Sequence, residues 1–170
     1  MNRVGMFLIL ASAFCALGVL LSGRADPQRT AFAQERSSVK KELVNPPDFY
    51  RSPYYTQAVG VRGGKTLYIS GQWSCNPKGE LVGKDDMHAQ AKQAFNNLKT
   101  VLSACGATAA NVVKINVYLV GYKGKDITAL DEGLKACFGT KRDFASTVVG
   151  VQALARDGML VEVEAIAVVE

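Results

Sequence analysis

The middle of the chain carries the segment that decides the fold, Val-Val-Lys-Ile-Asn-Val-Tyr-Leu at residues 112–119. Aliphatic residues occupy every second position up to Leu119, and the residues between them are Lys114, Asn116 and Tyr118. Because successive side chains of a strand point to opposite faces of the sheet, this alternation predicts a strand with one buried face. Such a strand needs a second layer to cover that face.

Two amphipathic segments on either side of this strand predict the covering layer. The first helix is expected to begin at Asp85 or Asp86 and to end before Gly106. Its apolar residues recur at helical spacing and comprise Ala91, Ala94, Phe95, Leu98, Val101, Leu102 and Cys105. The second helix is expected over residues 126–138, where Ile127, Leu130, Leu134 and Phe138 align before Gly139.

Short apolar runs predict the remaining strands. Residues 55–61 and 66–70 flank Arg62-Gly63-Gly64-Lys65, which is typical of a hairpin. A turn at residues 76–79 precedes a short strand at 80–82, and two final strands are expected at 146–151 and 160–168.

This order of elements predicts a single α+β domain, in which two helices cover one face of a mixed sheet. The other face would expose much apolar surface, which favours burial by oligomerisation.

The N-terminal residues have the pattern of an export signal. Residues 4–21 carry no charge and follow Arg3, and Ala31-Phe32-Ala33 is a cleavage pattern, so residues 1–33 are predicted to be a signal peptide. The stretch between the apolar run and the cleavage site is long, so an uncleaved membrane anchor remains the alternative. Either reading predicts an exported protein, which contacts the membrane only if this segment is retained. Residues 34–53, interrupted by Asn45-Pro46-Pro47, are predicted to link it to a domain at 54–170.

Charge and cysteine content exclude several functions. The formal net charge of +5 falls to +3 without residues 1–33, and the basic residues are scattered, which argues against a nucleic-acid partner. Cys75, Cys105 and Cys137 remain after cleavage of the signal peptide, an odd number with no disulfide framework, so at least one thiol is then free or pairs with another chain. His88 is the single histidine and no paired cysteine motif exists, which leaves no support for a metal site or a histidine-dependent triad.

Five segments, taken together in order and spacing, resemble the RidA (YjgF) family, also called the endoribonuclease L-PSP family. The resemblance covers residues 54–170, and its segments are 55–59, 69–72, 89–98, 112–119 and 160–167. It implies a chorismate-mutase-like fold, a homotrimer with clefts between subunits, and no cofactor. Characterised members hydrolyse reactive 2-imino or enamine acids to the keto acid and ammonia.

The resemblance also implies roles for particular residues. It places Tyr55 and Ser70 in the cleft, with Trp73 beside them, and assigns Glu162 to orient the attacking water. A polar cleft position that is often asparagine falls on Asp131. The residues alone also allow simpler readings, since alternation on a strand explains an outward Glu162 and a strand aromatic explains Tyr55.

The chain departs from the family at one position. Active deaminases carry an arginine that enters the penultimate strand, and here that position falls on Ser146. A guanidinium binds a carboxylate through two charge-assisted hydrogen bonds, whereas a serine hydroxyl offers one neutral donor. Loss of such a contact costs about 1–3 kcal/mol. Arg142 or Arg156 could substitute for it.

Three functions remain open on the sequence. The first is binding of a small organic ligand, similar to an imino, enamino or keto acid, with deaminase-type hydrolysis altered or absent. The second is a genuine imine or enamine deaminase that binds the carboxylate by another group. The third is a non-catalytic, exported trimeric binding module.

Overall fold

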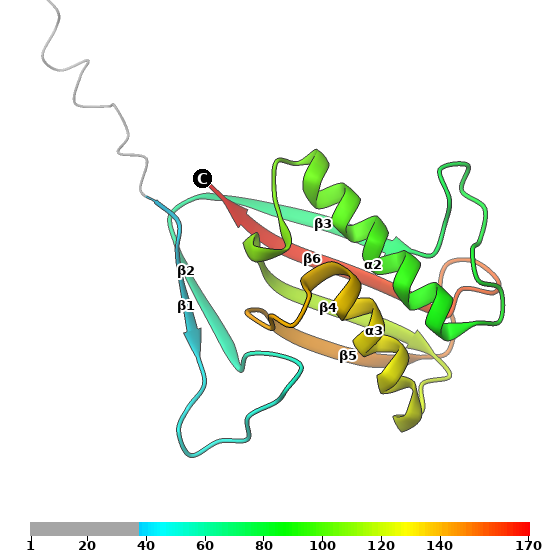
Figure 1. Ribbon diagram of the computed structural model, residues 1–170, viewed down its shortest axis with the longest axis horizontal. Coiled ribbons are helices and arrows are strands. Elements are labelled where there is room, and N and C mark those ends of the chain that lie inside the picture. The colour runs from blue at the N-terminus through cyan, green and yellow to red at the C-terminus, as the bar shows by residue number, and fades with distance from the viewer. Residues whose placement is uncertain (1–37) are drawn as a thin grey trace, which may run out of the picture. The chain divides into compact units, whose positions relative to one another are not determined.

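The computed structural model describes residues 38–170 (Figure 1). The predicted signal peptide at residues 1–33 and the first residues of the predicted linker lie outside this range. Within residues 38–170, no helix combines the length and apolar character that a membrane span requires.

A four-stranded mixed sheet forms the frame of the domain, with strand order β3-β6-β4-β5. Its strands are β3 (Lys65–Trp73), β4 (Val112–Val120), β5 (Ala145–Val151) and β6 (Val161–Val169). Strand β6 is antiparallel to both β3 and β4, while β5 is parallel to β4. A parallel pair needs a long crossover connection, and the helix between β4 and β5 supplies it.

Two helices cover one face of this sheet, α2 (Met87–Ala104) and α3 (Ile127–Phe138) (Figure 1). Asp86 caps α2, because its Oδ1 accepts a hydrogen bond from Ala89 N at 3.0 Å. Short 3₁₀ turns, η1 (Ala109–Asn111) and η2 (Gly124–Asp126), precede β4 and α3. The opposite face of the sheet carries no helix in the described part of the chain, and we call it the open face.

The core lies between the helices and the sheet. Phe95 of α2 meets Phe138 edge-on with ring centroids 6.2 Å apart, and Phe138 lies 4.5 Å from Phe144. Gly133 permits the two helices to approach, since a Cβ there would lie 2.5 Å from Phe95 Cδ2. The α+β architecture with two helices on one face of a mixed sheet is therefore confirmed.

The alternation in β4 is confirmed with one shift. Ile115, Val117 and Leu119 are buried against the helices as predicted. At the start of the strand, Val112 is buried in place of Val113. The register between β4 and β6 shifts between Val112 and Lys114, which changes the face to which the preceding residues point.

The N-terminal part of the domain differs from the prediction. Within the expected linker, β1 (Lys40–Val44) forms an antiparallel two-stranded sheet with β2 (Ala58–Arg62). Lys41 helps to hold this sheet to the domain, because its Nζ donates to Val112 O at 2.7 Å. The segment Lys40–Val44 is largely exposed, so its sequence has no apolar period to reveal a strand.

The predicted hairpin between residues 55–61 and 66–70 is wrong. The turn exists, with Gly63 and Gly64 at φ of 77° and 80°, but β2 pairs with β1 and β3 pairs with β6. The short strand expected at 80–82 is reduced to a single bridge between Cys75 and Leu81.

Candidate functional site

The predicted catalytic residue, Glu162, lies on the open face in a row with two aromatic residues. Its cross-strand partners are Trp73 on β3 and Tyr118 on β4. Residues directly opposite each other on neighbouring strands point to the same face. Val161 and Val163 on either side of Glu162 are fully buried against the helices, so the half-buried carboxylate points to the open face.

A bulge in β3 makes room for the Glu162 carboxylate. The register between β3 and β6 shifts between Ile69 and Gln72. A Cβ built on Gly71 in this bulge would overlap Oε1 of Glu162. Glycine is therefore required for the carboxylate to take this position, and the exposed Ser70 lies next to it. Three of the predicted site residues, Ser70, Trp73 and Glu162, thus belong to one group on the β3–β6 side of the sheet.

A second polar group lies on the same face around Glu164, and sequence reasoning missed it. Oε1 of Glu164 accepts hydrogen bonds from Asn116 Nδ2 at 2.6 Å and from Tyr118 Oη at 3.1 Å. The bond to Glu164 raises the pKa of the Tyr118 phenol, since it favours the protonated form. The only sequence signal for this group is the polar half of the alternating strands, and alternation by itself assigns no function to such residues.

The Glu164 group borders a hollow of about 270 Å³. Its polar lining residues are Tyr68, Ser70, Lys114, Asn116 and Glu164. Lys114 Nζ donates to Thr147 Oγ1 at 2.6 Å, and burial lowers the pKa of Lys114. The open face therefore combines an aromatic row with a charged and hydrogen-bonded hollow.

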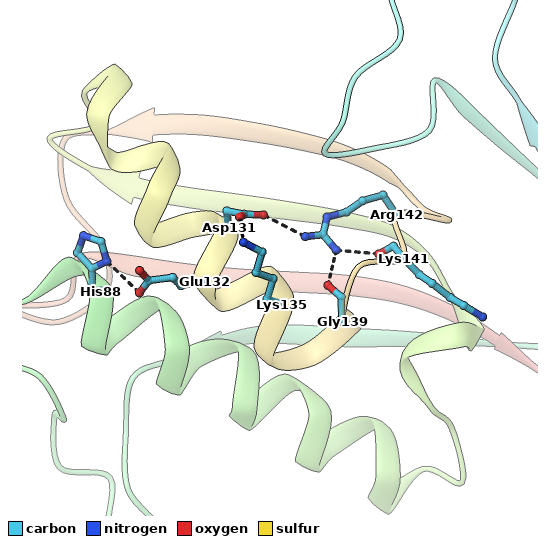
Figure 2. A network of polar contacts seen from close by, with 7 residues as sticks. All are labelled: His88, Asp131, Glu132, Lys135, Gly139, Lys141 and Arg142. Carbon is cyan, nitrogen blue, oxygen red and sulfur yellow. Dashed lines mark hydrogen bonds and ion pairs between the residues drawn. The ribbon is translucent and has the colours of Figure 1, made fainter.

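Asp131 lies on α3 in the helix layer (Figure 2), whereas Glu162 points to the opposite face of the sheet. Its carboxylate pairs with Lys135 Nζ at 2.6 Å and accepts from Arg142 Nη2 at 3.1 Å. These hydrogen bonds, with the one from Lys135 the stronger, lower the pKa of Asp131 despite its partial burial. Arg142 also donates to the carbonyls of Gly139 and Lys141 at 2.8 and 2.9 Å. Asp131 and Arg142 thus hold the turn between α3 and β5.

The same view shows an ion pair between the helices (Figure 2). His88 Nδ1 of α2 lies 3.0 Å from Glu132 Oε2 of α3, and both side chains are more than half exposed. His88 therefore forms an exposed ion pair on the surface of the helix layer.

Two further predicted site residues, Ser146 and Tyr55, lie in strand β5 and beside its start. Ser146 pairs with the buried Ile115, so its side chain points to the helix layer, on the face opposite Glu162. Thr147 pairs with Asn116 and is the residue that shares the open face. Tyr55 lies beside the start of β5, because its neighbour Thr56 donates through N to Phe144 O at 2.9 Å.

The cysteines are all unpaired in the described part of the chain. Cys75 is half-buried beside Asn97, whose Nδ2 donates to the carbonyls of Trp73 and Cys75 at 2.8 and 3.0 Å. Burial raises the pKa of Cys137 to about 11. Between residues 38 and 170 no three histidine, cysteine or acidic side chains gather as a metal site.

The comparison with known proteins decides the family. Residues 49–169 match the family model described as endoribonuclease L-PSP. The chain belongs to this family. It is the RidA/YjgF family that the sequence resemblance indicated, and its proteins are typically homotrimers.

Relatives of this RidA-family chain include proteins named 2-iminobutanoate/2-iminopropanoate deaminase. The one from Dermatophagoides farinae is 36% identical over 116 residues, which cover 68% of this chain and 86% of the relative. The human one is 33% identical over 114 residues, covering 67% and 79%. The RidA-family assignment thus rests on relatives that the chain matches over most of their length.

Solved structures show the same RidA-type fold. A Yersinia pestis protein described as YyfB of the conserved Rid family, of unknown function, has a TM-score of 0.71 at 38% identity, over 76% of this chain and 98% of that one. RidA from the Antarctic bacterium Psychrobacter sp. has a TM-score of 0.53 at 37% identity, over 68% and 88%.

Proposed function

We propose that this protein binds a small imino-, enamino- or keto-acid-like ligand in clefts between the subunits of a homotrimer, with deaminase-type hydrolysis slowed or absent. One observation carries the proposal. Glu162 is presented on the open face between Trp73 and Tyr118, but strand β5 supplies no basic residue to that face. This arrangement supports a cleft that keeps the water-orienting group and lacks the carboxylate-binding arginine that the family resemblance implies for active members.

The chemistry of this site follows from the carboxylate. Hydrolysis of an imine adds water to the carbon of the C=N bond and then releases ammonia, which leaves the keto acid. The reaction needs a positioned water, a group that accepts its proton, and a contact that holds the substrate. Glu162 meets the second need, because its carboxylate is half-buried yet reaches the open face.

The absence of an arginine on β5 lowers the expected ligand affinity and hydrolysis rate. The residues of β5 on the open face are Thr147 and Val149, which pair with Asn116 and Tyr118. A neutral hydroxyl in place of a guanidinium weakens a carboxylate contact by about 1.5–3 kcal/mol, or roughly ten- to a hundredfold. The ligand is therefore bound more weakly, or turned over more slowly, than in active relatives.

The arrangement of the candidate residues supports a cleft between subunits. Ser70, Trp73 and Glu162 lie on the β3–β6 side of the sheet, whereas Tyr55 lies beside β5 at the opposite edge. Both groups can line one cleft if different subunits contribute them. The open face also leaves Tyr68 81% exposed, as expected for a surface that another subunit covers.

We also propose that the protein is exported. The support is the apolar segment and the Ala-x-Ala pattern within residues 1–33, together with the positive residue before them. Fractionation of producing cells and N-terminal sequencing of the isolated protein test this. A chain that retains Met1 and stays in the cytoplasmic fraction would contradict it.

The function itself is tested by assay of the full chain with freshly generated 2-iminopropanoate, with ammonia and keto-acid release both measured. Binding of 2-ketobutyrate is followed in parallel by calorimetry, and the oligomeric state by light scattering. Keto-acid binding by a trimer with little acceleration supports the proposal. Acceleration similar to that of a deaminase relative, lost in Glu162→Gln, would favour the genuine deaminase. Neither binding nor acceleration would favour the non-catalytic module.

A further inference from the structure

The loop between β5 and β6 brings a guanidinium to the row that contains Glu162. The loop, which contains Arg156, lies at the end of the sheet where β3 terminates (Figure 1). The Cζ of Arg156 is 5.0 Å from the centroid of the Trp73 ring, a cation–π distance. Trp73 is the direct cross-strand partner of Glu162. The cation, the indole and the carboxylate therefore follow one another at this end of the open face.

A fully buried glutamine orders the loop that carries Arg156. Gln90 of α2 donates through Nε2 to Gly158 O at 2.8 Å and to Gly83 O at 3.1 Å. Its Oε1 accepts from Leu160 N at 2.8 Å. A buried amide with all these bonds satisfied holds its partners firmly, because breaking any of them leaves an unpaired buried group. The backbone on the C-terminal side of Arg156 is thus tied to the helix.

Arg156 has no acidic partner among residues 38–170, since the ion pairs there involve only His88, Lys135 and Arg142. Its one polar contact is a long bond of 3.5 Å from Nη1 to Gly79 O. Arg142, the other candidate substitute, is held by Asp131 and backbone carbonyls in the helix layer. Of these two candidates, Arg156 is the one whose donors stay available on the side of Glu162.

We propose that Arg156, which lies over the Trp73 ring, binds the carboxylate of the ligand and so substitutes in part for the arginine missing from β5. The inference rests on the proposed function and assigns the group that binds the carboxylate of its ligand. The contact with the indole uses none of the N–H donors of Arg156 in a hydrogen bond, so the guanidinium keeps donors for a carboxylate. Trp73 is then a positioning residue that acts through Arg156.

The spacing suits such a ligand. Cβ atoms of directly opposed residues on antiparallel strands lie about 4.5–5.5 Å apart. The Arg156 guanidinium adds the 5.0 Å from the Trp73 ring. In a 2-imino acid the carboxylate is bonded directly to the imine carbon. A carboxylate at Arg156 therefore keeps that carbon on the open face, on the same side of the sheet as Glu162.

The test measures binding of 2-ketobutyrate to the full chain, its Arg156→Ala and Arg156→Gln variants, and Arg62→Ala. Arg62 is an exposed arginine in the other sheet, which makes it a matched control. We expect at least a tenfold loss of affinity in both Arg156 variants, partial rescue by Arg156→Lys, and no more than a twofold change in Arg62→Ala.

Thermal midpoints and light scattering identify any variant that has lost its fold or assembly, and the folded Arg156 variant decides the test. Butanone, which lacks the carboxylate, should bind the parent and both variants equally weakly.

The possible failures are distinct. Binding by the parent that survives both Arg156 substitutions would overturn the inference and leave the proposed function standing. Binding lost in Lys114→Gln but not in the Arg156 variants would place the carboxylate in the hollow beside Glu164 and would also overturn the inference. A parent that binds neither 2-ketobutyrate nor 2-iminopropanoate would overturn both proposals.

Discussion

The Glu162 carboxylate occupies the position that a side chain at residue 71 would take, and Gly71 has no side chain to fill it. The β3 bulge brings the Gly71 backbone so close to β6 that a Cβ would overlap Glu162 Oε1. The site therefore depends on a glycine that makes no polar contact with a ligand. Its effect is to let a charged side chain lie flat against the sheet between two aromatic residues.

Gly71→Ala is expected to destabilise the protein by about 1–3 kcal/mol, because the added methyl group must displace either the carboxylate or the strand. In a Glu162→Ala background the same substitution should cost much less, so the two changes should couple in a double-mutant cycle. Urea denaturation measures all four proteins.

Gly60→Ala is the matched control for this cycle. It lies in β2, where a Cβ would meet only Glu42 at ordinary contact distances of 3.6 and 3.7 Å. Its stability should change by less than about 1 kcal/mol. If Gly71→Ala lowers the free energy of unfolding equally with and without the Glu162 carboxylate, the glycine is required only by the backbone of the bulge.

Cys105 and Cys137 should differ sharply in reactivity. Cys105 is exposed, whereas Cys137 is 6% exposed with its pKa raised by burial to about 11. At pH 8 only about one Cys137 thiol in a thousand is then ionised, and the thiolate is the nucleophile. Iodoacetamide should label Cys105 in the folded protein and reach Cys137 only in urea, as peptide mass spectrometry can show. Equal labelling of both without denaturant would contradict the buried position.

Asp131→Asn should destabilise the protein by about 1–2 kcal/mol, because Arg142 loses its charged partner while it remains 11% exposed. The ordinary pKa of this carboxyl is 3.8, and the ion pairs lower it in the folded state. The stabilising contribution is therefore complete above the unfolded value and is lost as pH falls through the lower folded value. The difference between the urea midpoints of parent and variant should be constant from pH 6 to 8 and should shrink below about pH 4.

Glu132→Gln provides the comparison for that experiment. Its pair with His88 is exposed on both sides, and exposed pairs contribute about 0–1 kcal/mol. A loss as large as that of Asp131→Asn would mean that the ion pairs of the helix layer are equivalent, contrary to the burial of Arg142.

The parts of the fold that the sequence predicted are those with a local signal. Ile115, Val117 and Leu119 alternate because they face a helix layer, and α2 and α3 carry apolar residues at helical spacing. Strand β1 has no such signal, since Lys40–Val44 is held by pairing with β2 and by the contact of Lys41 with Val112. Pairing partners distant in sequence leave no mark on the segment itself.

In the candidate site, too, the residues with a local sequence signal could be predicted, and those that depend on distant pairing could not. Glu162 could be placed on an outward face, because its neighbours are apolar on both sides. The pairing of Asp131 with Arg142 depends on how the turn after α3 folds back, which no spacing reveals. The face of Ser146 depends on strand register, and a shift of one residue moves every side chain to the other face.

That one-residue difference leads to the sharpest functional prediction. Thr147→Arg should place a guanidinium on the open face beside Asn116, whereas Ser146→Arg should direct it into the helix layer beside Ile115. We expect Thr147→Arg to bind 2-ketobutyrate roughly ten- to a hundredfold more tightly, as a charge-assisted contact of about 1.5–3 kcal/mol implies. Ser146→Arg should instead lose about 1–2 kcal/mol of stability, because Ser146 is half-buried and an unpaired charge there is partly removed from water.

Calorimetry and urea denaturation measure both effects on the same two proteins. Because Thr147 Oγ1 accepts from Lys114 in the parent, Thr147→Val controls for loss of that bond without adding charge. A gain of affinity in Ser146→Arg with unchanged stability would contradict the register of β5. A gain in Thr147→Arg that also accelerates 2-iminopropanoate hydrolysis, and that Glu162→Gln removes, would show that weak carboxylate binding was what limited this site.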